Sequence, residues 1–362
     1  VCMPTSQPEL SSSHAALGVI GTGMAGIGLA RALRRLGDQR SITLISADSG
    51  DDYSKPLLST GFAKGLAPDK LAQRNAAELG DELNARIITH TLVAALDVDN
   101  RTLLLDVGQA PNYEKLSSEK LSYETLVLAT GAAPRMPFSI NPSVAPRCFT
   151  INDLDDYRRF YQALGQGPAR VAIVGAGLVR LCLGRTIDSL TPSSSDDIIL
   201  RLDNGVAISA DLVLMATGLT PRTALAEAAG LSVTPSGIQV DRQLRTSHPD
   251  IYALGDVACV DGVNAMYVQP LQASAKALAA TLAGTPTPVS FGAWPIVVKT
   301  PLLPVVAYPP TTPPERWRIE GEGGDISALA ENKDGRLIGF ALTGGCVRRK
   351  VELSRAAPTL LG

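Results

Sequence analysis

The chain has 362 residues and a formal net charge of −2, and hydrophobic residues make up 45 % of it. A chain of this length is expected to divide into two or three domains, each with its own core. The small net charge excludes the broad basic surface typical of proteins that bind nucleic acid or acidic membranes. Since no run of about 18 apolar residues occurs, no membrane span is expected either.

Five cysteines are scattered along the chain, with no CxxC pair and no histidine at metal-binding spacing: Cys2, Cys148, Cys182, Cys259 and Cys346. This pattern argues against a zinc site, a disulfide framework and a redox-active dithiol. Isolated thiols are typical of a reducing compartment, and residues 1–14 lack the apolar segment of a secretory signal. We therefore expect a cytoplasmic protein without a metal site, and a disordered segment over residues 1–14.

The first predicted element is a short apolar strand, residues 17–20, which runs into the motif Gly21-x-Gly23-x-x-Gly26. Gly21 permits a tight turn, Gly23 lets the backbone approach a pyrophosphate, and Gly26 allows the next helix to pack closely on the strand. That helix, expected to end near Leu36, presents unpaired N–H groups to phosphate oxygens. The order of strand, glycine turn and helix predicts a dinucleotide-binding site.

A second predicted strand, residues 41–46, ends at Ala47 and Asp48. In dinucleotide-binding folds an acidic side chain about 20 residues after the glycine motif holds a ribose hydroxyl. Asp48 is placed to do this, which strengthens the prediction from the glycine motif.

The chain repeats the unit that these elements begin. The first unit closes with residues 126–131 (LVLATG), a second opens with residues 171–177 (VAIVGAG), and the second closes with residues 212–218 (LVLMATG). Two duplicated Rossmann-like halves, one inserted into the other, would give this pattern. The second unit is much the shorter, so it is expected to hold little more than one βαβ unit.

The second glycine motif is also incomplete. Arg180 stands at the place of the third glycine, and residues 191–197 are typical of a loop rather than of a strand that ends in an acid. A bulky side chain at that place pushes the helix away from the strand. From the residues alone, a remnant unit without nucleotide and a working NAD site at Gly175 and Gly177 are equally good interpretations.

The pattern of the remaining residues indicates that residues 223–285 belong to the same domain as the first unit and that a separate domain follows. A helix is expected over residues 223–229, a strand ending in a turn over residues 250–256 and a helix over residues 271–283. Alternating apolar runs after residue 286 predict an antiparallel sheet. The fold class is therefore α/β, with two nested Rossmann-like domains, the second truncated, and a C-terminal α+β domain with an antiparallel sheet. The expected boundaries are residues 15–145 and 223–285 for the first domain, 146–222 for the shortened second domain and 286–362 for the C-terminal domain.

Three further residues are informative only as a set. Lys55, which precedes Pro56, could contact a phosphate or a flavin ring. Lys299 is a cation of a kind that stabilises a reduced flavin, and Asp256 on a strand-end turn suits a polyol hydroxyl. Taken alone, the two lysines are typical of surface loops, and an acid such as Asp256 is more often solvated than bound to a ligand.

The order of these motifs resembles the FAD-dependent pyridine nucleotide–disulfide oxidoreductase superfamily, and within it the bacterial rubredoxin–NAD reductases. The resemblance covers most of the chain outside the shortened unit, and its segments include residues 19–28, 53–62 (YSKPLLSTGF), 244–256 (LRTSHPDIYALGD), 298–301 (VKTP) and 338–344 (IGFALTG). It implies an FAD-binding domain, an inserted NADH-binding domain and a C-terminal domain that contributes to the flavin site.

The resemblance also implies a reaction and its partners. NADH gives a hydride to FAD, and electrons then pass one at a time to the iron of rubredoxin, an acidic protein, in support of alkane degradation or oxygen detoxification. Lys55 and Lys299 would be the catalytic residues, both close to the flavin. The residues implied to bind FAD or NADH are Gly21, Thr22, Gly23, Met24, Ala25, Gly26, Ala47, Asp48, Lys55, Pro56, Val93, Thr130, Gly131, Gly175, Gly177, Gly255, Asp256, Val268 and Lys299.

Within this set the resemblance assigns parts of the cofactor. Residues 22–25 hold the pyrophosphate, Asp48 lies by the adenosine ribose, Val93 meets adenine, Asp256 binds the ribityl chain, and Val268 and Lys299 contact the flavin edge.

Two departures from the family concern the second unit. The family has glycine where Arg180 stands and glutamate where Cys182 stands, and residues 184–195 replace a much longer stretch. Three hypotheses therefore stay open: an NADH-dependent rubredoxin reductase, a reductase of ferredoxin or another acceptor, and a flavin-binding protein without NADH turnover.

Overall fold

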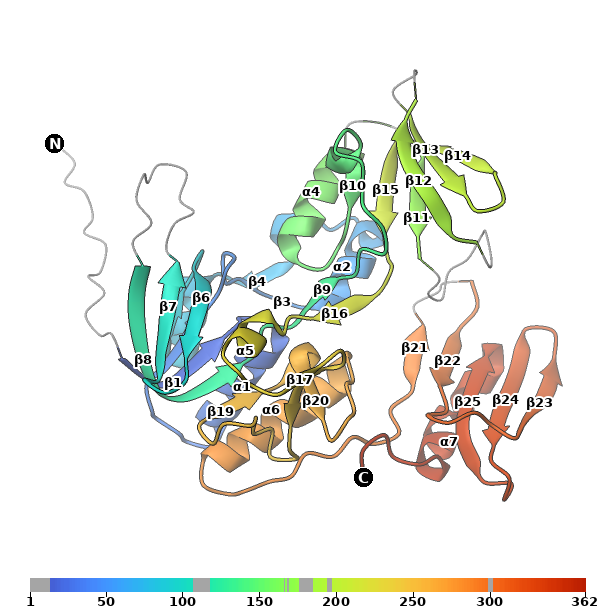
Figure 1. Ribbon diagram of the computed structural model, residues 1–362. Helices are drawn as coiled ribbons and strands as arrows, with labels where there is room; N and C mark the ends of the chain where they lie inside the picture. Colours follow the sequence, from blue (N-terminus) through green and yellow to red (C-terminus); the bar gives the residue numbers. More distant parts are fainter. Residues whose placement is uncertain are drawn as a thin grey trace.

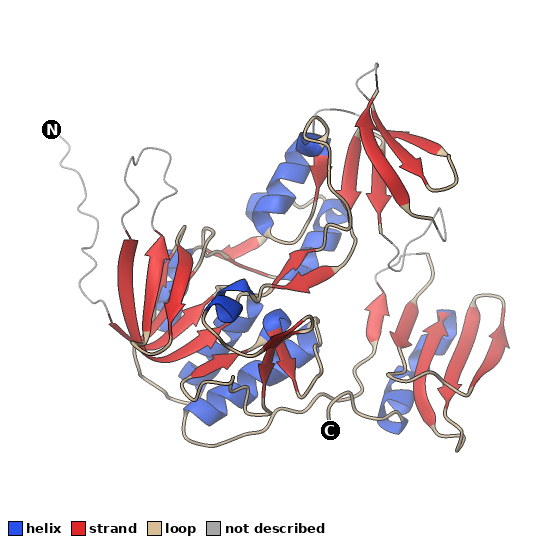
Figure 2. Ribbon diagram, in the orientation of Figure 1, coloured by secondary structure: helices blue, strands red, loops and turns tan. Residues whose placement is uncertain are grey.

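The computed structural model describes residues 14–106, 118–165, 167, 169–175, 185–193, 197–298 and 302–362. The described residues form three bodies: a large one from the N-terminal part of the chain and a later return segment, a smaller one from the middle, and a C-terminal one (Figure 1). Helices lie mainly in the first body, whereas the other two consist largely of strands (Figure 2). Apart from His14, the segment expected to be disordered lies outside the described residues.

The sheet of the first body has a parallel half. Its central strand β1 (His14–Ile20) pairs in parallel with β2 (Ile42–Ile45) on one side and with β8 (Ser118–Leu128) on the other. β5 (Arg86–Ile88) extends the sheet beyond β2, and β19 (Ile251–Ala253) pairs in parallel with β8. The late strand β19 therefore completes the sheet of the N-terminal unit, as nested halves require.

The other half of this sheet is an antiparallel meander of β6 (Leu92–Asp97), β7 (Thr102–Asp106) and β8. Helix α1 (Met24–Arg35) packs against α6 (Val268–Leu282), and α3 (Ala76–Leu83) precedes β5. The core between sheet and helices is fully buried at Leu17, Leu29, Leu33, Leu126 and Leu278. β1 is apolar along most of its length because both of its faces are covered.

The predicted elements of this body differ from the observed ones mainly at their ends. Helix α6 begins three residues before the predicted residue 271, with Pro270 in its first turn, where the missing N–H is no loss. A small sheet of β17 (Val233–Thr234), β18 (Gly237–Val240) and β20 (Ala258–Val260) accompanies α5 (Ala224–Ala228) and the 3-10 turn η4 (Gly255–Val257).

A helical segment follows β2 and reaches toward the second body. It contains α2 (Lys55–Gly61), the 3-10 turns η1 (Phe62–Lys64) and η2 (Pro68–Lys70), and the strand pair β3 (Asp52–Tyr53) and β4 (Ala72–Arg74). Leu58 and Leu71 of this segment pack on Leu154 and Tyr157 of α4 (Leu154–Leu164).

The second body is a parallel sheet in the order β10 (Cys148–Phe149), β15 (Leu212–Met215) and β11 (Val171–Val174), with the 3-10 turn η3 (Ala145–Arg147) before it. A meander of β12 (Ile187–Pro192), β13 (Ile198–Leu202) and β14 (Ala207–Ala210) packs beside it. The loop expected from residue 191 begins only after Pro192, because residues 191 and 192 pair with β13.

The two glycine-motif units begin in the same way, but their first strands, β1 and β11, differ in strand pairing and in burial. β1 has a strand on each side, whereas β11 pairs only with β15 among the described strands. Ile173 in β11 is 61 % exposed, while Leu17 and Val19 in β1 are fully buried. The apolar sequence of β11 thus lies in a sheet that is covered less completely than the first.

Two short strands join these bodies. β9 (Ala132–Pro134) leaves the first body, β16 (Leu219–Pro221) returns to it, and the two pair in antiparallel fashion. They lie side by side in Figure 1.

The C-terminal body is the expected antiparallel sheet, in the order β21 (Ile296–Val298), β22 (Val305–Tyr308), β25 (Leu337–Thr343), β24 (Asp325–Glu331) and β23 (Arg316–Glu322). The 3-10 helix η5 (Gly344–Arg349) and α7 (Lys350–Ala356) cover one face. The edge strand β23 was not predicted, since all seven of its residues are exposed and four are charged. Among the described residues no helix is long and apolar enough to cross a membrane.

Candidate functional site

The three glycines of the first motif have the three environments that the motif predicts. Gly21 has a φ of +117°, and a Cβ atom there would overlap the carbonyl oxygen of Ala129 at the end of β8. A Cβ atom on Gly26 would overlap the carbonyl oxygen of Gly21. A Cβ atom on Gly23, in contrast, would meet nothing within 4 Å. Gly21 and Gly26 therefore lie packed against backbone atoms, whereas the backbone at Gly23 is open to a ligand.

The open glycine is the N-cap of helix α1. No side chain of the described residues caps this end of the helix, and no acidic residue lies in its first turn. The N–H groups at residues 24–26 are thus available to an anion, and the helix dipole favours one.

Helix α6 also begins close to this point. Gly255, with a φ of +79°, lies between the two helices: a Cβ atom there would lie 2.8 Å from Cβ of Ala25 and 3.8 Å from Cδ1 of Leu271. The structure thereby brings Ala25, Gly255 and the start of α6 at Val268 together, although they are far apart in the sequence.

The predicted ribose side of the site adjoins the glycine loop. Thr22 donates a hydrogen bond to Ser46 at 2.7 Å, and Ser46 donates one to Asp48. The backbone N–H of His90 donates to the carbonyl oxygen of Asp48 at 2.8 Å, which brings the chain leading to Val93 alongside. Ala47 is exposed between its neighbours. Sequence reasoning missed Ser46, because a hydroxyl contact across 24 positions leaves no local signal.

Lys55, the first residue of α2, is the partly buried cation of the site. Burial lowers the pKa of its ammonium group, and the nearby charge of Asp256 opposes that shift. Burial likewise raises the pKa of Asp256, and Lys55 opposes this shift in turn. Lys55 and Asp256 therefore lie near enough for each charge to act on the other, in a partly desolvated region where charges act strongly.

Two other predicted residues, Thr130 and Gly131, lie between β8 of the first body and β9, the strand that leaves it. Thr130 donates to the carbonyl oxygen of Arg222 at 3.0 Å, and the N–H of Arg222 donates to Gly131 at 3.0 Å. The Arg222 charge also depresses the pKa of Lys55, after burial and against the effect of Asp256. Pro56 follows Lys55 in the first turn of α2.

Within the described residues, the second glycine motif shows the first feature of this geometry. Gly175 has a φ of +157°, and a Cβ atom there would overlap the carbonyl oxygen of Ala216, as Gly21 does with Ala129. Gly177, Arg180, Cys182 and Lys299 lie outside the described residues. Among the described residues no group of three or more histidine, cysteine or acidic side chains is arranged to hold a metal ion.

The first motif fits a dinucleotide. The backbone at Gly23 is open, the N–H groups of α1 face an anion, and a carboxylate stands at the end of the neighbouring strand. A flavin dinucleotide also needs a partly desolvated region beyond the pyrophosphate, and Lys55 and Asp256 lie in one. The residues therefore suit FAD.

Comparison with known families agrees with this geometry. Residues 16–181 and 179–279 match the family pyridine nucleotide-disulphide oxidoreductase. The chain belongs to this family. It carries, in addition, a match over residues 288–357 to the rubredoxin binding C-terminal domain.

Curated relatives of this oxidoreductase align along nearly their whole length. A rubredoxin-NAD(+) reductase of Alcanivorax borkumensis is 35 % identical over 391 residues, which cover 95 % of this chain and 98 % of the relative. A second one, of Acinetobacter baylyi, is 31 % identical over 395 residues (95 % and 98 %). The nitric oxide reductase FlRd-NAD(+) reductase of Citrobacter koseri is 30 % identical over 388 residues (94 % and 98 %).

The comparisons also show that the Alcanivorax relative is longer than the present chain. The alignment with the Alcanivorax relative spans 391 positions although this chain has 362 residues, so the relative contains residues without counterpart here. The two family matches meet at residues 179–181. That junction lies in the second glycine motif, where Arg180 takes the place of the third glycine.

Solved structures with the same fold are more distant in sequence. The covalent putidaredoxin reductase–putidaredoxin complex has a TM-score of 0.79 at 22 % identity and covers 94 % of this chain and 91 % of that one. NADH:rubredoxin oxidoreductase from Clostridium acetobutylicum has a TM-score of 0.74 at 18 % identity, with 96 % of each chain covered. At such identities the likeness establishes the α/β fold alone.

Proposed function

We propose that the chain is an FAD-dependent oxidoreductase that takes electrons from NADH and passes them to rubredoxin. The observation that carries the proposal is the convergence of the open glycine Gly23, the starts of α1 and α6, and the Lys55–Asp256 pair. The family match of residues 288–357 and the names of the curated relatives support rubredoxin as the acceptor.

Bound FAD supplies a ring that accepts two electrons as a hydride and releases them singly. The protein supplies the rest. The N–H groups at the start of α1 hold the pyrophosphate, Asp48 accepts from the adenosine ribose, and Asp256 accepts from the ribityl chain. The ammonium of Lys55 stabilises negative charge on the ring, aided by Lys299, which the family resemblance assigns to the same region.

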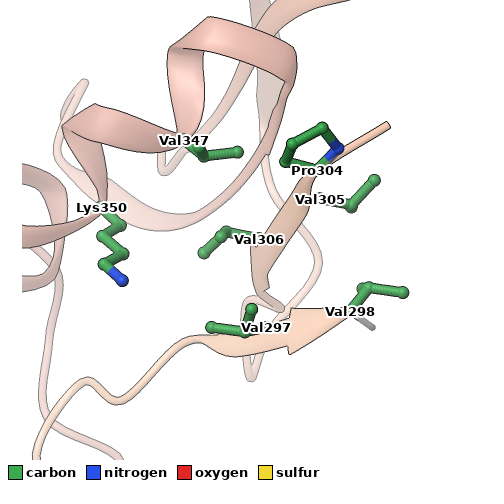
Figure 3. A pocket seen from close by; sticks show the side chains of 7 residues that line it. All are labelled: Val297, Val298, Pro304, Val305, Val306, Val347 and Lys350. Carbon is green, nitrogen blue, oxygen red and sulfur yellow. The ribbon is translucent and has the colours of Figure 1, made fainter. Parts of the chain in front are cut away.

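Rubredoxin docking is proposed on the C-terminal body. An apolar hollow of about 250 Å³ is lined by Val297, Val298, Pro304, Val305, Val306, Val347 and Lys350. In Figure 3, Val306 lies between Val347 and Val297, and Lys350 lies to one side of them. Val297 is 57 % exposed on the edge strand β21. An apolar centre with one lysine, Lys350, beside it is complementary to a small acidic electron carrier.

A second candidate function is that of a flavin-binding protein without NADH turnover. The exposed Ile173 favours it, and so does the pairing of β11 with β15 alone among the described strands. A complete nucleotide-binding sheet covers both faces and both sides of its first strand. A reductase of ferredoxin or another acceptor would use the same flavin site with a different docking surface.

One experiment separates these candidates. The purified protein is expected to carry flavin absorbance, to lose it on anaerobic addition of NADH, and then to reduce added rubredoxin. Flavin that NADH leaves oxidised would support the second candidate. Bleached flavin that reduces ferredoxin but not rubredoxin would support the third, and a protein without flavin would contradict all of them.

The finer assignments belong to the same proposal. Reaction in the cytoplasm is supported by the free thiols Cys148, Cys259 and Cys346. A role in alkane degradation rests on the family resemblance, and a strain lacking the gene is then expected to grow on acetate but not on an n-alkane. The domain boundary at residues 222/223 is supported by β16, which ends at Pro221. The boundaries at 145/146 and 285/286 are proposed with it, although Val144 already packs into the core of the second body.

A further inference from the structure

Ser46 connects the two halves of the dinucleotide site. It follows β2 directly, and only 5 % of its surface is exposed. Its N–H donates to the carbonyl oxygen of Ile88 at 2.8 Å, and its own carbonyl oxygen accepts from the N–H of Thr91 at 2.9 Å. Because both backbone groups are engaged, the hydroxyl is held at one place between the glycine loop and Asp48.

The hydroxyl of Ser46 accepts one hydrogen bond and donates another. Thr22 Oγ1 donates to Ser46 Oγ at 2.7 Å, and Ser46 Oγ donates to Asp48 Oδ1. The direction is determined because a carboxylate only accepts and a hydroxyl has one proton to give. Thr22 is 6 % exposed, so Ser46 takes the place of water as the acceptor for its hydroxyl.

The same contacts decide which oxygen of Asp48 is available. Oδ1 accepts from the hydroxyl of Ser46 and from the N–H of Gly50, the latter at 2.9 Å. Oδ2 has no hydrogen bond to any residue that the structure describes. A ribose hydroxyl can therefore donate to Oδ2 without displacing an existing contact.

We infer that Ser46 is a positioning residue for FAD: it holds Asp48 so that Oδ2 faces the adenosine ribose, and it ties that carboxylate to Thr22 in the pyrophosphate loop. The inference rests on the flavin site of the proposed function but not on the electron donor or acceptor. Ser46 acts through Asp48, so its effect must disappear when the carboxylate is absent.

The test is a double-mutant cycle on FAD affinity, measured by titrating apoprotein with FAD and following the quenching of flavin fluorescence. Ser46→Ala is expected to weaken FAD binding about tenfold, since one hydrogen bond to a charged group is lost from the positioned carboxylate. In an Asp48→Ala background the same change is expected to cost less than about threefold. Ser46→Thr, which keeps the hydroxyl, is expected to restore most of the affinity.

Equal losses in both backgrounds, or no loss in the native background, would overturn the inference, because Ser46 would then act independently of Asp48 or not at all. Should Ser46→Ala not fold, the nearly isosteric Ser46→Cys is expected to show a smaller loss with the same dependence on Asp48, because a thiol is a weaker donor. Apoprotein that binds no FAD would overturn this inference together with the flavin assignment. FAD binding without rubredoxin reduction would contradict the proposed function alone.

Discussion

Gly255 lies so close to Ala25 that a Cβ atom on the glycine would be 2.8 Å from that of the alanine. The contact joins the turn η4, which carries Asp256, to the first turn of α1. Gly255 also has a φ of +79°, a conformation that other residues adopt only with strain. Asp256 is thus placed beside the pyrophosphate loop by a close approach that only glycine permits.

Gly255→Ala is therefore expected to destabilise the protein by about 2–4 kcal/mol, the sum of backbone strain and a steric overlap in a packed region. It should also lower the flavin content, because Asp256 and α1 move apart. Gly262→Ala is the matched control: Gly262 has a φ of +83°, but a Cβ atom there would meet nothing within 4 Å. Thermal unfolding and flavin absorbance of both variants check this, and equal losses would show that strain rather than the contact matters.

Substituting the first glycine of each motif, Gly21 or Gly175, is expected to affect FAD binding in one case and reduction by NADH in the other. Gly21→Ala and Gly175→Ala each place a Cβ atom against a carbonyl oxygen, of Ala129 and Ala216 respectively. Gly21→Ala is expected to yield protein with little bound FAD. Gly175→Ala should retain FAD but be reduced at least about tenfold more slowly by NADH, since displacement of a loop near reacting groups commonly costs this much or more. Flavin content and stopped-flow bleaching are the measurements, and loss of FAD in Gly175→Ala would contradict the assignment.

Burial of Lys55 predicts opposite effects on stability and on flavin chemistry. Its lowered pKa means that the unfolded chain holds the proton more tightly than the folded chain does. Stability of the native protein therefore rises with pH between the lowered pKa and the ordinary value of 10.5. Apoprotein with Lys55→Met is expected to melt higher than native apoprotein at pH 7, and this advantage should narrow at pH 10.

The same substitution removes a cation from the flavin ring. The midpoint potential of the bound flavin is expected to become at least about 30 mV more negative, which corresponds to about 1.4 kcal/mol for two electrons. A redox titration with a reference dye measures this shift. An unchanged potential would show that Lys55 does not act on the ring, whatever its effect on the melting temperature.

The sequence predicted local features of the site well and its assembled contacts poorly. The roles of Gly21, Gly23 and Gly26 follow from neighbours within a few positions, and the structure reproduces their environments. Contacts such as Thr22 with Ser46 depend on where strands meet in the sheet, which local patterns do not encode. The edge strand β23 was missed for a related reason: its alternation of Arg316, Trp317 and Arg318 leaves no buried face, so no hydrophobic period marks it.

Rubredoxin docking on the C-terminal body predicts an effect that depends on where a charge lies rather than on net charge. Lys350 lies at the rim of the hollow that Val297 and Val347 line. The end of β25 nearer the hollow is Thr343, because its pairing partner Val305 lines the hollow. Arg336 lies in the turn that precedes the other end of β25. Both side chains belong to exposed residues, so charge reversal at either position should leave the fold intact.

Lys350→Glu is accordingly expected to raise the KM for rubredoxin about tenfold and to weaken its dependence on salt, because a favourable charge at the rim becomes a repulsive one. Arg336→Glu changes the net charge equally but should leave the KM within about twofold, since screening removes most of its influence at that distance. Reduction of ferricyanide by NADH needs no docking and should be unchanged in both variants. Equal shifts of the KM in the two variants would mean that rubredoxin responds to overall charge, and the hollow beside Lys350 would then not be its docking site.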